Sequence, residues 1–267
     1  MEVLQFNLEN RSLAYSWSHG VHPNPLVVLH GLGDSAIHTY SSRFATTVLH
    51  DTPSLFVDLP GFGEGSATDT YPSNIETMAL DVVCMLSDLK LSRPTIFAHS
   101  MGANIALCLA HHQPEIVGNL ILAEPLLHPE NSVLAGSIAK HSEQTFVTSR
   151  YNMLVRATSL QTARGDEVAK AFLQTLKMAN PVAMYRSAAS LLGDRDPGFQ
   201  EMLINLEQPV SLLVGSRTKV TTANLERENM TIIRVPNAGH FMMVESATET
   251  ACAILEVVNR MQFRGNP

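Results

Sequence analysis

The sequence predicts an α/β protein in which a mostly parallel sheet of eight strands is flanked by helices and carries an inserted helical cap. Three observations support this fold class. Short apolar runs alternate with helical patterns, as is typical of a parallel sheet covered on both faces. The later runs are continuously apolar, which indicates strands buried on both faces. One long interval has helical patterns and no strand-like run, which indicates an insertion.

The predicted strands follow one another in a regular order. The first two, VLQFNL and SLAYSW, are close enough to form an opening hairpin. The other six follow in order, with helical patterns between them. The eight ranges are 3–8, 12–17, 26–31, 55–60, 95–100, 120–125, 210–215 and 231–236.

Helical periodicity predicts four helices in the core. The first begins after Ser73 or Asn74, since either side chain is a suitable N-cap. The four ranges are 73–90, 101–112, 221–227 and 244–262.

The interval 128–205 is predicted to be the cap. It contains the helical patterns SVLAGSIAKHSEQTFVTSRYNMLVRA and EVAKAFLQTLKMA, and a structureless loop of this length is uncommon in a compact domain. Breakers at His128-Pro129 and Asp196-Pro197-Gly198 mark its edges. We therefore expect a core of residues 1–127 and 206–267 and a cap of residues 128–205.

Composition narrows the class of protein. The chain has 267 residues, of which 45% are hydrophobic and 16% charged, and this balance is that of a globular protein. The net charge is -7 and the Lys and Arg residues are scattered, which argues against binding to nucleic acid. We expect a small-molecule substrate as the partner; the oligomeric state is not predicted.

The sequence also suggests a compartment. MEVLQFNLEN lacks the basic and apolar regions of a leader, and no run of about 18 apolar residues follows, so we expect a cytoplasmic protein with no membrane partner. Cys84, Cys108 and Cys252 are odd in number and lie in apolar helical patterns, which predicts buried reduced thiols. No metal is expected, because His and Cys residues show no ligand-like spacing.

The segment Ala98-His99-Ser100-Met101-Gly102 places a serine between a predicted strand and a predicted helix. This is the layout of a nucleophile elbow, which usually has the pattern GxSxG. Small residues are needed there because the backbone makes close approaches in the sharp turn. Gly102 meets that need, and Ala98 is a mild departure. Taken alone, the segment is equally compatible with a capping serine at a strand-to-helix turn.

Three further motifs each follow a predicted strand. HGLG is at 30–33, DLPGFG at 58–63 and NAGHF at 237–241. With AHSMGA at 98–103, and in this order, the chain resembles the α/β-hydrolase superfamily over nearly its whole length.

The resemblance implies a serine hydrolase with Ser100 as nucleophile and His240 as general base, and no cofactor. The chemistry agrees, since a serine hydroxyl needs an imidazole to accept its proton at neutral pH. The amides of Leu32 and Met101 are expected to form the oxyanion hole.

The sequence departs from the family pattern at the third member of the triad. Thr218 stands where an aspartate is expected beyond the seventh strand, and the carboxylates Glu226 and Glu228 are expected to face away from the site. Some relatives carry the acid at the end of the sixth strand, where this chain has Glu124. We predict Glu124 as the acid that orients His240. The alternatives are a capping or salt-bridging Glu124 beside a Ser-His dyad.

Apolar residues of the cap and the last loop are candidates for the substrate pocket. We single out Phe241, Met242 and Tyr151 as substrate-binding residues, although most apolar residues of the cap must pack it onto the core. Asp34 lies just past the oxyanion loop, where capping a loop is the simpler role. His99 and His30 are expected to be structural.

The predicted function is hydrolysis of a small carboxylic ester or lactone through an acyl-enzyme on Ser100. Two alternatives remain at this stage. One is a carbon-carbon hydrolase or lyase on the same fold, which would use the same serine and histidine. The other is a non-catalytic ligand receptor, which the residues Ala98 and Thr218 make conceivable. The sequence does not identify the substrate or its chain length.

Overall fold

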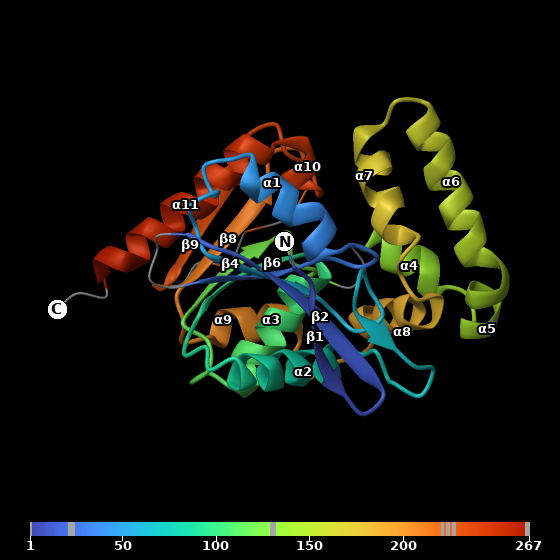
Figure 1. Cartoon of the computed structure of the whole chain (residues 1–267), viewed down its shortest axis with the longest axis horizontal. Helices are drawn as coiled ribbons and strands as arrows, with labels where there is room; N and C mark the ends of the chain where they lie inside the picture. Colours follow the sequence, from blue (N-terminus) through green and yellow to red (C-terminus); the bar gives the residue numbers. More distant parts are fainter. Residues whose placement is uncertain are drawn as a thin grey trace.

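In the computed structural model, the described residues form a nine-stranded sheet with helices on both faces and a helical cap beside it (Figure 1). The structure describes residues 2–20, 25–128, 132–219, 222, 225 and 228–264, with side chains as far as residue 260. The strand order is β1-β2-β4-β3-β6-β7-β8-β9, and β5 pairs with β2. The strands are β1 (Leu4–Leu8), β2 (Arg11–Ser18), β3 (Leu26–Leu29), β4 (Ser54–Asp58), β5 (Ser66–Ala67), β6 (Thr95–His99), β7 (Asn119–Ala123), β8 (Val210–Gly215) and β9 (Met230–Val235).

The pairing directions confirm the predicted mostly parallel sheet with an opening hairpin. β2 is antiparallel to β1 and to β4, and every pairing from β4 across to β9 is parallel. The sequence pattern does not predict β5, because its two residues are too few to show a period. The parallel strands all end at one edge of the sheet, where loops of an α/β protein collect functional side chains.

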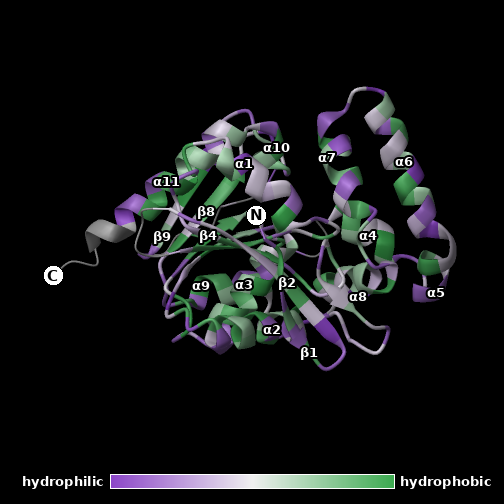
Figure 2. Cartoon of the chain, viewed as in Figure 1, coloured by the Kyte–Doolittle hydropathy of each residue, from purple (hydrophilic) through white to green (hydrophobic). Residues whose placement is uncertain are grey.

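Helices cover the two faces of the sheet in separate groups (Figure 1). One face is covered by α2 (Ile75–Asp88), α3 (Met101–His112) and α9 (Phe199–Asn205), and the other by η1 (Ala36–Tyr40), α1 (Ser41–Ala45), α10 (Met242–Glu245) and α11 (Ala247–Arg264). Along β3, Val27 and Leu29 pack on the face covered by α2, α3 and α9, and Leu26 and Val28 pack on the opposite face. A strand buried on both faces is therefore continuously apolar, as Figure 2 shows for the central strands.

The helices agree with the sequence prediction in part. Asn74 is the N-cap of α2 and accepts a hydrogen bond from the Thr77 amide at 2.8 Å, as expected for one of the two candidates. The predicted helix 244–262 is two helices, because Ser246 ends α10 and its hydroxyl lies 3.0 Å from the Glu249 carboxylate, as in a new helix start. The predicted helix 221–227 lies mostly outside the described residues. η1 and α1 are not predicted, since five residues each are too few to show a helical period.

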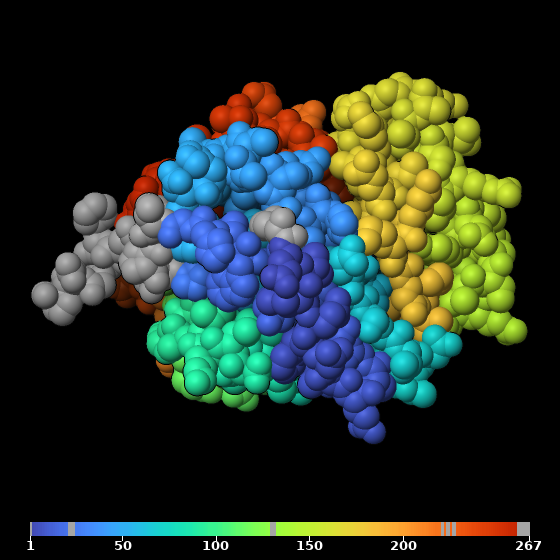
Figure 3. All heavy atoms as spheres, in the orientation of Figure 1, coloured from blue at the N-terminus to red at the C-terminus, as the bar shows by residue number. Residues whose placement is uncertain are grey.

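The cap consists of α4 (Val133–Ala139), α5 (Glu143–Thr145), η3 (Phe146–Arg150), α6 (Tyr151–Ala163), α7 (Glu167–Leu176) and α8 (Pro181–Leu192). It forms a lobe against the core in the space-filling view, drawn in yellow, green and gold (Figure 3). α8 fastens this lobe, because Arg186 donates to the carbonyls of Asp69 and Tyr71 at 2.7 and 2.8 Å. α9 packs with α3 on the core side, and the boundaries 128–205 of the cap stay a prediction.

The expectation of three buried thiols is wrong for two of them. Cys108 is buried in α3, whereas Cys84 and Cys252 are exposed although both lie on helices. Each of these thiols lies on the solvent-exposed side of its helix, which the local apolar composition does not reveal. In the part of the chain that the structure describes, no helix is both long and apolar enough to cross a bilayer.

Candidate active site

Ser100 lies at the sharp turn between β6 and α3. Its φ of 51° and ψ of -119° belong to a backbone region that a residue with a side chain rarely adopts, and such strain is typical of functional turns. A Cβ at Gly102 would lie 2.6 Å from the His30 carbonyl oxygen, so only glycine fits beside the turn. The sequence therefore folds into the elbow geometry that its pattern predicts.

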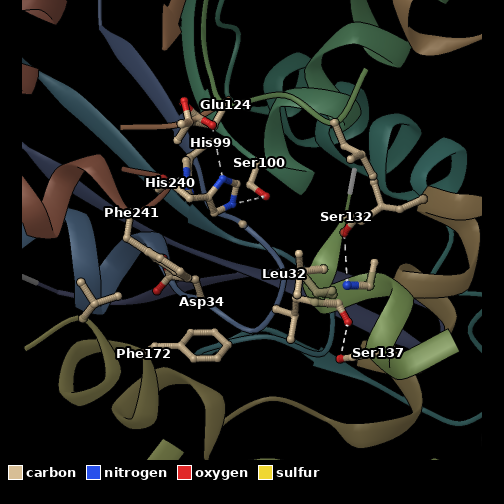
Figure 4. A pocket seen from close by; sticks show the side chains of 18 of the residues that line it. Leu32, Asp34, His99, Ser100, Glu124, Ser132, Ser137, Phe172, His240 and Phe241 are labelled. Atoms are coloured by element: carbon tan, nitrogen blue, oxygen red, sulfur yellow. Dashed lines mark hydrogen bonds and ion pairs between the residues drawn. The ribbon is translucent and has the colours of Figure 1, made fainter. Parts of the chain in front are cut away.

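His240 reaches Ser100 from the loop that follows β9, although the two residues are 140 positions apart. Its Nε2 lies 3.1 Å from Ser100 Oγ, and the serine hydroxyl can donate to it (Figure 4). The imidazole side chain is 45% exposed, so one face is open to the cavity described below. This distance is within the range expected of a general base and its nucleophile.

Glu124 follows β7 and lies on the other side of the same imidazole (Figure 4). Its Oε2 is 3.6 Å from His240 Nδ1, an ion-pair distance that is longer than a hydrogen bond. Its Oε1 accepts hydrogen bonds from the Gly215 amide at 2.7 Å and from the Thr218 hydroxyl at 2.8 Å. Thr218 thus occupies the place expected of an aspartate and donates to the carboxylate that the chain carries on a neighbouring strand.

The expected oxyanion donors lie on either side of Ser100. Met101 is the first residue of α3, and the first amides of a helix have no acceptor within it. Leu32 belongs to the turn after β3, whose neighbour Gly31 is so close to Ser100 that a Cβ there would lie 3.2 Å from the serine Cβ. The roles of the Leu32 and Met101 amides remain predictions, and both residues are placed beside the nucleophile.

Glu245 supports the histidine loop, and the sequence analysis does not single it out. Its Oε2 accepts from the Gly239 amide at 2.8 Å, and its Oε1 is paired with Arg217 at 2.5 Å. A Cβ at Gly239 would lie 2.8 Å from Glu245 Oε1. The carboxylate of Glu245 thus packs directly against Gly239, and no motif in the sequence marks Glu245 for this role.

The two histidines expected to be structural are both buried. His30 donates from Nδ1 to the Gly31 carbonyl at 2.8 Å and accepts at Nε2 from the Leu59 amide at 3.0 Å. His99 lies within 2.7 Å of the His240 carbonyl oxygen through its Nε2. Burial, and secondarily the neighbouring His240, lower the pKa of His99 to about 3, so its ring is uncharged at neutral pH.

A cavity of about 690 Å³ lies next to Ser100 and His240, between the core and the cap. This volume is typical of a site for a small organic molecule. Cap residues close it with mainly apolar side chains, and Phe172 of α7 faces Phe241 at a ring distance of 5.7 Å (Figure 4). The larger apolar lining residues are Leu32, Leu126, Leu127, Val133, Leu134, Leu154, Val168, Phe172, Leu191 and Phe241.

Of the three residues predicted to bind substrate, only Phe241 lines this cavity. Tyr151 is instead a packing residue of the cap, since its hydroxyl donates to the carbonyls of Leu176 and Ala179. Met242 is 1% exposed and belongs to the core between the sheet and α11. Their apolar character reflects packing, which periodicity alone does not separate from a pocket role.

Asp34 lines the cavity and also fastens the oxyanion loop. It is 4% exposed, and its Oδ1 accepts hydrogen bonds from the Ser35 amide and the Thr39 hydroxyl. Burial raises its pKa, and the hydrogen bond from Thr39 opposes that effect. Asp58 accepts hydrogen bonds from the Ser35 hydroxyl and the Ile37 amide, and from the Glu64 amide at 3.0 Å, so it joins the start of η1 to the glycine-rich turn after β4.

The arrangement offers a hydroxyl, an imidazole and a carboxylate in line at the edge of an apolar cavity. Such a set can activate the serine oxygen for attack on a carbonyl carbon. Among the described residues, no group of three or more His, Cys, Asp or Glu side chains has the arrangement of a metal site.

Comparison with known proteins agrees with the fold and the motifs. Residues 26–253 match the model of the alpha/beta hydrolase family, and the chain belongs to that family. An uncharacterized hydrolase of Bacillus subtilis is 26% identical over 121 residues, which are 45% of this chain and 43% of that protein. The dihydrolipoyllysine-residue acetyltransferase component of the acetoin cleaving system of Pseudomonas putida is 22% identical over 84% of this chain and 60% of its own length. The chain thus matches less than two thirds of the length of these relatives.

Solved structures share the fold over nearly the entire chain. An esterase from Thermogutta terrifontis with malate bound has a TM-score of 0.77 at 18% identity, covering 97% of this chain and 99% of its own. A variant of the N-acyl homoserine lactonase AidH in complex with N-hexanoyl homoserine has a TM-score of 0.77 at 16% identity, covering 97% and 96%. At these identities the likeness concerns the fold.

Proposed function

We propose that this protein is a serine hydrolase that cleaves a carboxylic ester or lactone through an acyl-enzyme on Ser100. The observation that carries the proposal is the 3.1 Å distance between Ser100 Oγ and His240 Nε2 at the edge of an apolar cavity. A serine without a base at this distance would be a poor nucleophile at neutral pH. The esterase and the lactonase of similar fold add support for the class of substrate.

The first half of the reaction forms the acyl-enzyme. Ser100 Oγ attacks the carbonyl carbon of the ester while its proton passes to His240 Nε2. The amides of Leu32 and Met101 stabilise the negative charge on the carbonyl oxygen of the tetrahedral intermediate. The bond to the leaving oxygen then breaks, and the alcohol leaves with the proton from His240.

The second half returns the enzyme to its starting state. A water molecule gives a proton to His240 and attacks the acyl carbon, and the second tetrahedral intermediate releases Ser100, which recovers its proton. Glu124 keeps the Nδ1 proton of His240 toward itself and stabilises the imidazolium in both halves. These steps require no metal or cofactor. For a lactone, the alcohol stays attached to the acyl group and leaves with it.

The cavity favours an uncharged, mainly apolar substrate of modest size. Its lining is largely aliphatic and aromatic on the cap side, where a charged group would lose hydration. The carboxylates of Asp34 and Glu124 beside Ser100 already accept hydrogen bonds within the protein. Phe172 and Phe241 are suited to contact the acyl or alcohol chain beside the imidazole.

A fluorophosphonate probe tests the proposal directly, because it reacts with an activated serine and mimics the tetrahedral intermediate. We expect the wild-type protein to be labelled at Ser100, the variants Ser100→Ala and His240→Ala to lose the label, and the exposed control Ser216→Ala to keep it. Absence of labelling in the wild type, with no turnover, would favour the non-catalytic receptor.

A substrate panel then separates the reaction classes. It comprises p-nitrophenyl esters of increasing chain length, lactones, thioesters and a β-diketone for carbon-carbon cleavage. Faster turnover of the β-diketone than of every ester would replace the ester hydrolase with a carbon-carbon hydrolase.

A further inference from the structure

His99, the residue before the nucleophile, joins three parts of the candidate site. Its Nε2 lies 2.7 Å from the carbonyl oxygen of His240, across 141 positions of the chain. Its ring is 4.9 Å from the His240 ring, at an angle of 49°. On its other side, a Cβ at Gly31 would lie 3.2 Å from His99 Nδ1, so the ring also touches the oxyanion turn.

The hydrogen bond to His240 fixes the tautomer of His99. A carbonyl oxygen can only accept, so the proton of the neutral ring must be on Nε2. Nδ1 is then an acceptor, and it is buried without a hydrogen-bond partner in the described part of the chain. A buried acceptor without a partner costs stability. A purely structural ring at this position would be better replaced by an apolar side chain.

We propose that His99 is a positioning residue whose Nε2–H bond to the His240 carbonyl holds the imidazole of His240 in line with Ser100. This inference rests on the proposed function, in which His240 is the general base. His240 follows a glycine and its side chain is half exposed. Glu245 holds the loop at the Gly239 amide, and the bond from His99 holds the backbone of His240 itself. His99 is 2% exposed and part of β6, which makes it a rigid support next to the nucleophile.

The geometry links this bond directly to the nucleophile. Ser100 is attached to His99 directly, so the strand that places Oγ also places the donor that holds the histidine loop. A shift of the loop by about 1 Å can reduce the rate of a reaction about a hundredfold. The Gly31 contact extends the same support to the oxyanion turn, where a larger residue would displace the ring.

The experiment compares His99→Met, His99→Gln and His99→Asn with the exposed control His112→Met. Methionine is close in volume and has no donor; glutamine carries its amide one bond farther from the backbone than asparagine and can reach the His240 carbonyl. We measure kcat and KM for a p-nitrophenyl ester, the rate of fluorophosphonate labelling at Ser100, and the melting temperature.

Positioning predicts that His99→Met lowers kcat and the labelling rate about 10- to 100-fold, with KM within about twofold and the melting temperature at pH 7 unchanged or raised. His99→Gln should recover most of the rate and His99→Asn should not. If His99→Met does not fold, the comparison of these two variants tests the positioning role of His99. Equal rates in the glutamine and asparagine variants, or full activity of His99→Met beside an inactive Ser100→Ala, would overturn the inference. An active Ser100→Ala would instead refute the proposed function.

Discussion

Replacing Glu124 with glutamine removes a negative charge from beside His240 and keeps the size of the side chain. The amide oxygen can still accept from Gly215 and Thr218, which hold Oε1 at 2.7 and 2.8 Å. The amide nitrogen then faces Nδ1 of His240, so the NH2 group of the glutamine and the N–H group of the imidazole are two hydrogen-bond donors pointed at each other. The imidazole is pushed toward the tautomer with its proton on Nε2, which cannot accept the proton of Ser100.

The magnitude follows from the distance between the two groups. At 3.6 Å and an effective dielectric constant of about 20, the attraction between the carboxylate and the imidazolium is about 4.6 kcal/mol. Because the imidazole is 45% exposed, solvent screens part of this attraction, and we take about half of the energy, or roughly 2 to 3 kcal/mol. This corresponds to a loss of roughly 30- to 150-fold in kcat/KM.

The assay is hydrolysis of a p-nitrophenyl ester by Glu124→Gln, from pH 5 to 10, beside the exposed control Glu228→Gln. The control should match the wild type. The melting temperature of Glu124→Gln should stay close to that of the wild type, because both hydrogen bonds to Oε1 can persist. A loss smaller than about threefold at every pH would remove Glu124 from the triad and leave a Ser-His dyad.

Four other changes test separate parts of the account. Thr218→Val removes a donor to Glu124 and should lower kcat about 3- to 10-fold in the same assay, and unchanged kcat would contradict that role. Gly102→Ala forces a carbon to within 2.6 Å of a carbonyl oxygen and should destabilise the fold by at least about 2 kcal/mol in urea unfolding, whereas a neutral result would contradict the close approach. Phe172→Ala should shift preference toward longer acyl chains, and an unchanged ratio of long- to short-chain kcat/KM would exclude Phe172 from the chain pocket. Because the pKa of His99 falls from 6.5 to about 3 on folding, its contribution to stability is complete above pH 6.5 and is lost as the pH falls toward 3. Between pH 7 and pH 4, the melting temperature of His99→Met should therefore fall less than that of the wild type. An equal fall in both proteins would refute this.

The fold was largely predictable because its signals are local and repeated. Continuous apolar runs mark the central strands, and the motif glycines lie where the backbone makes close contacts, as Gly102 and Gly31 show. The short elements β5, η1 and α1 were not predictable, since two to five residues carry no period. η1 and α1 nevertheless cover part of one face of the sheet, with Tyr40 and Phe44 in the core.

The grouping of the three candidate residues could be predicted from their places in the order of strands. Ser100, His240 and Glu124 follow β6, β9 and β7, so the parallel sheet brings them to one edge. The hydrogen bond from Thr218 to Glu124 and the support of Gly239 by Glu245 depend on contacts between separate loops. No local sequence pattern indicates such contacts.

The pocket was the least predictable part. Tyr151 and Met242 are apolar and close in sequence to residues that line the cavity, and both are used for packing. Which side of a cap helix faces the cavity depends on how the helices pack, and single-helix periodicity does not specify it.

The most direct test of the central claim is an intact-mass measurement on protein quenched with acid during turnover of a p-nitrophenyl ester. The account predicts a fraction of protein heavier by one acyl group, with the added mass on the peptide that contains Ser100, and no such species in Ser100→Ala. Steady hydrolysis by Ser100→Ala, or an acyl group located on another residue, would contradict it.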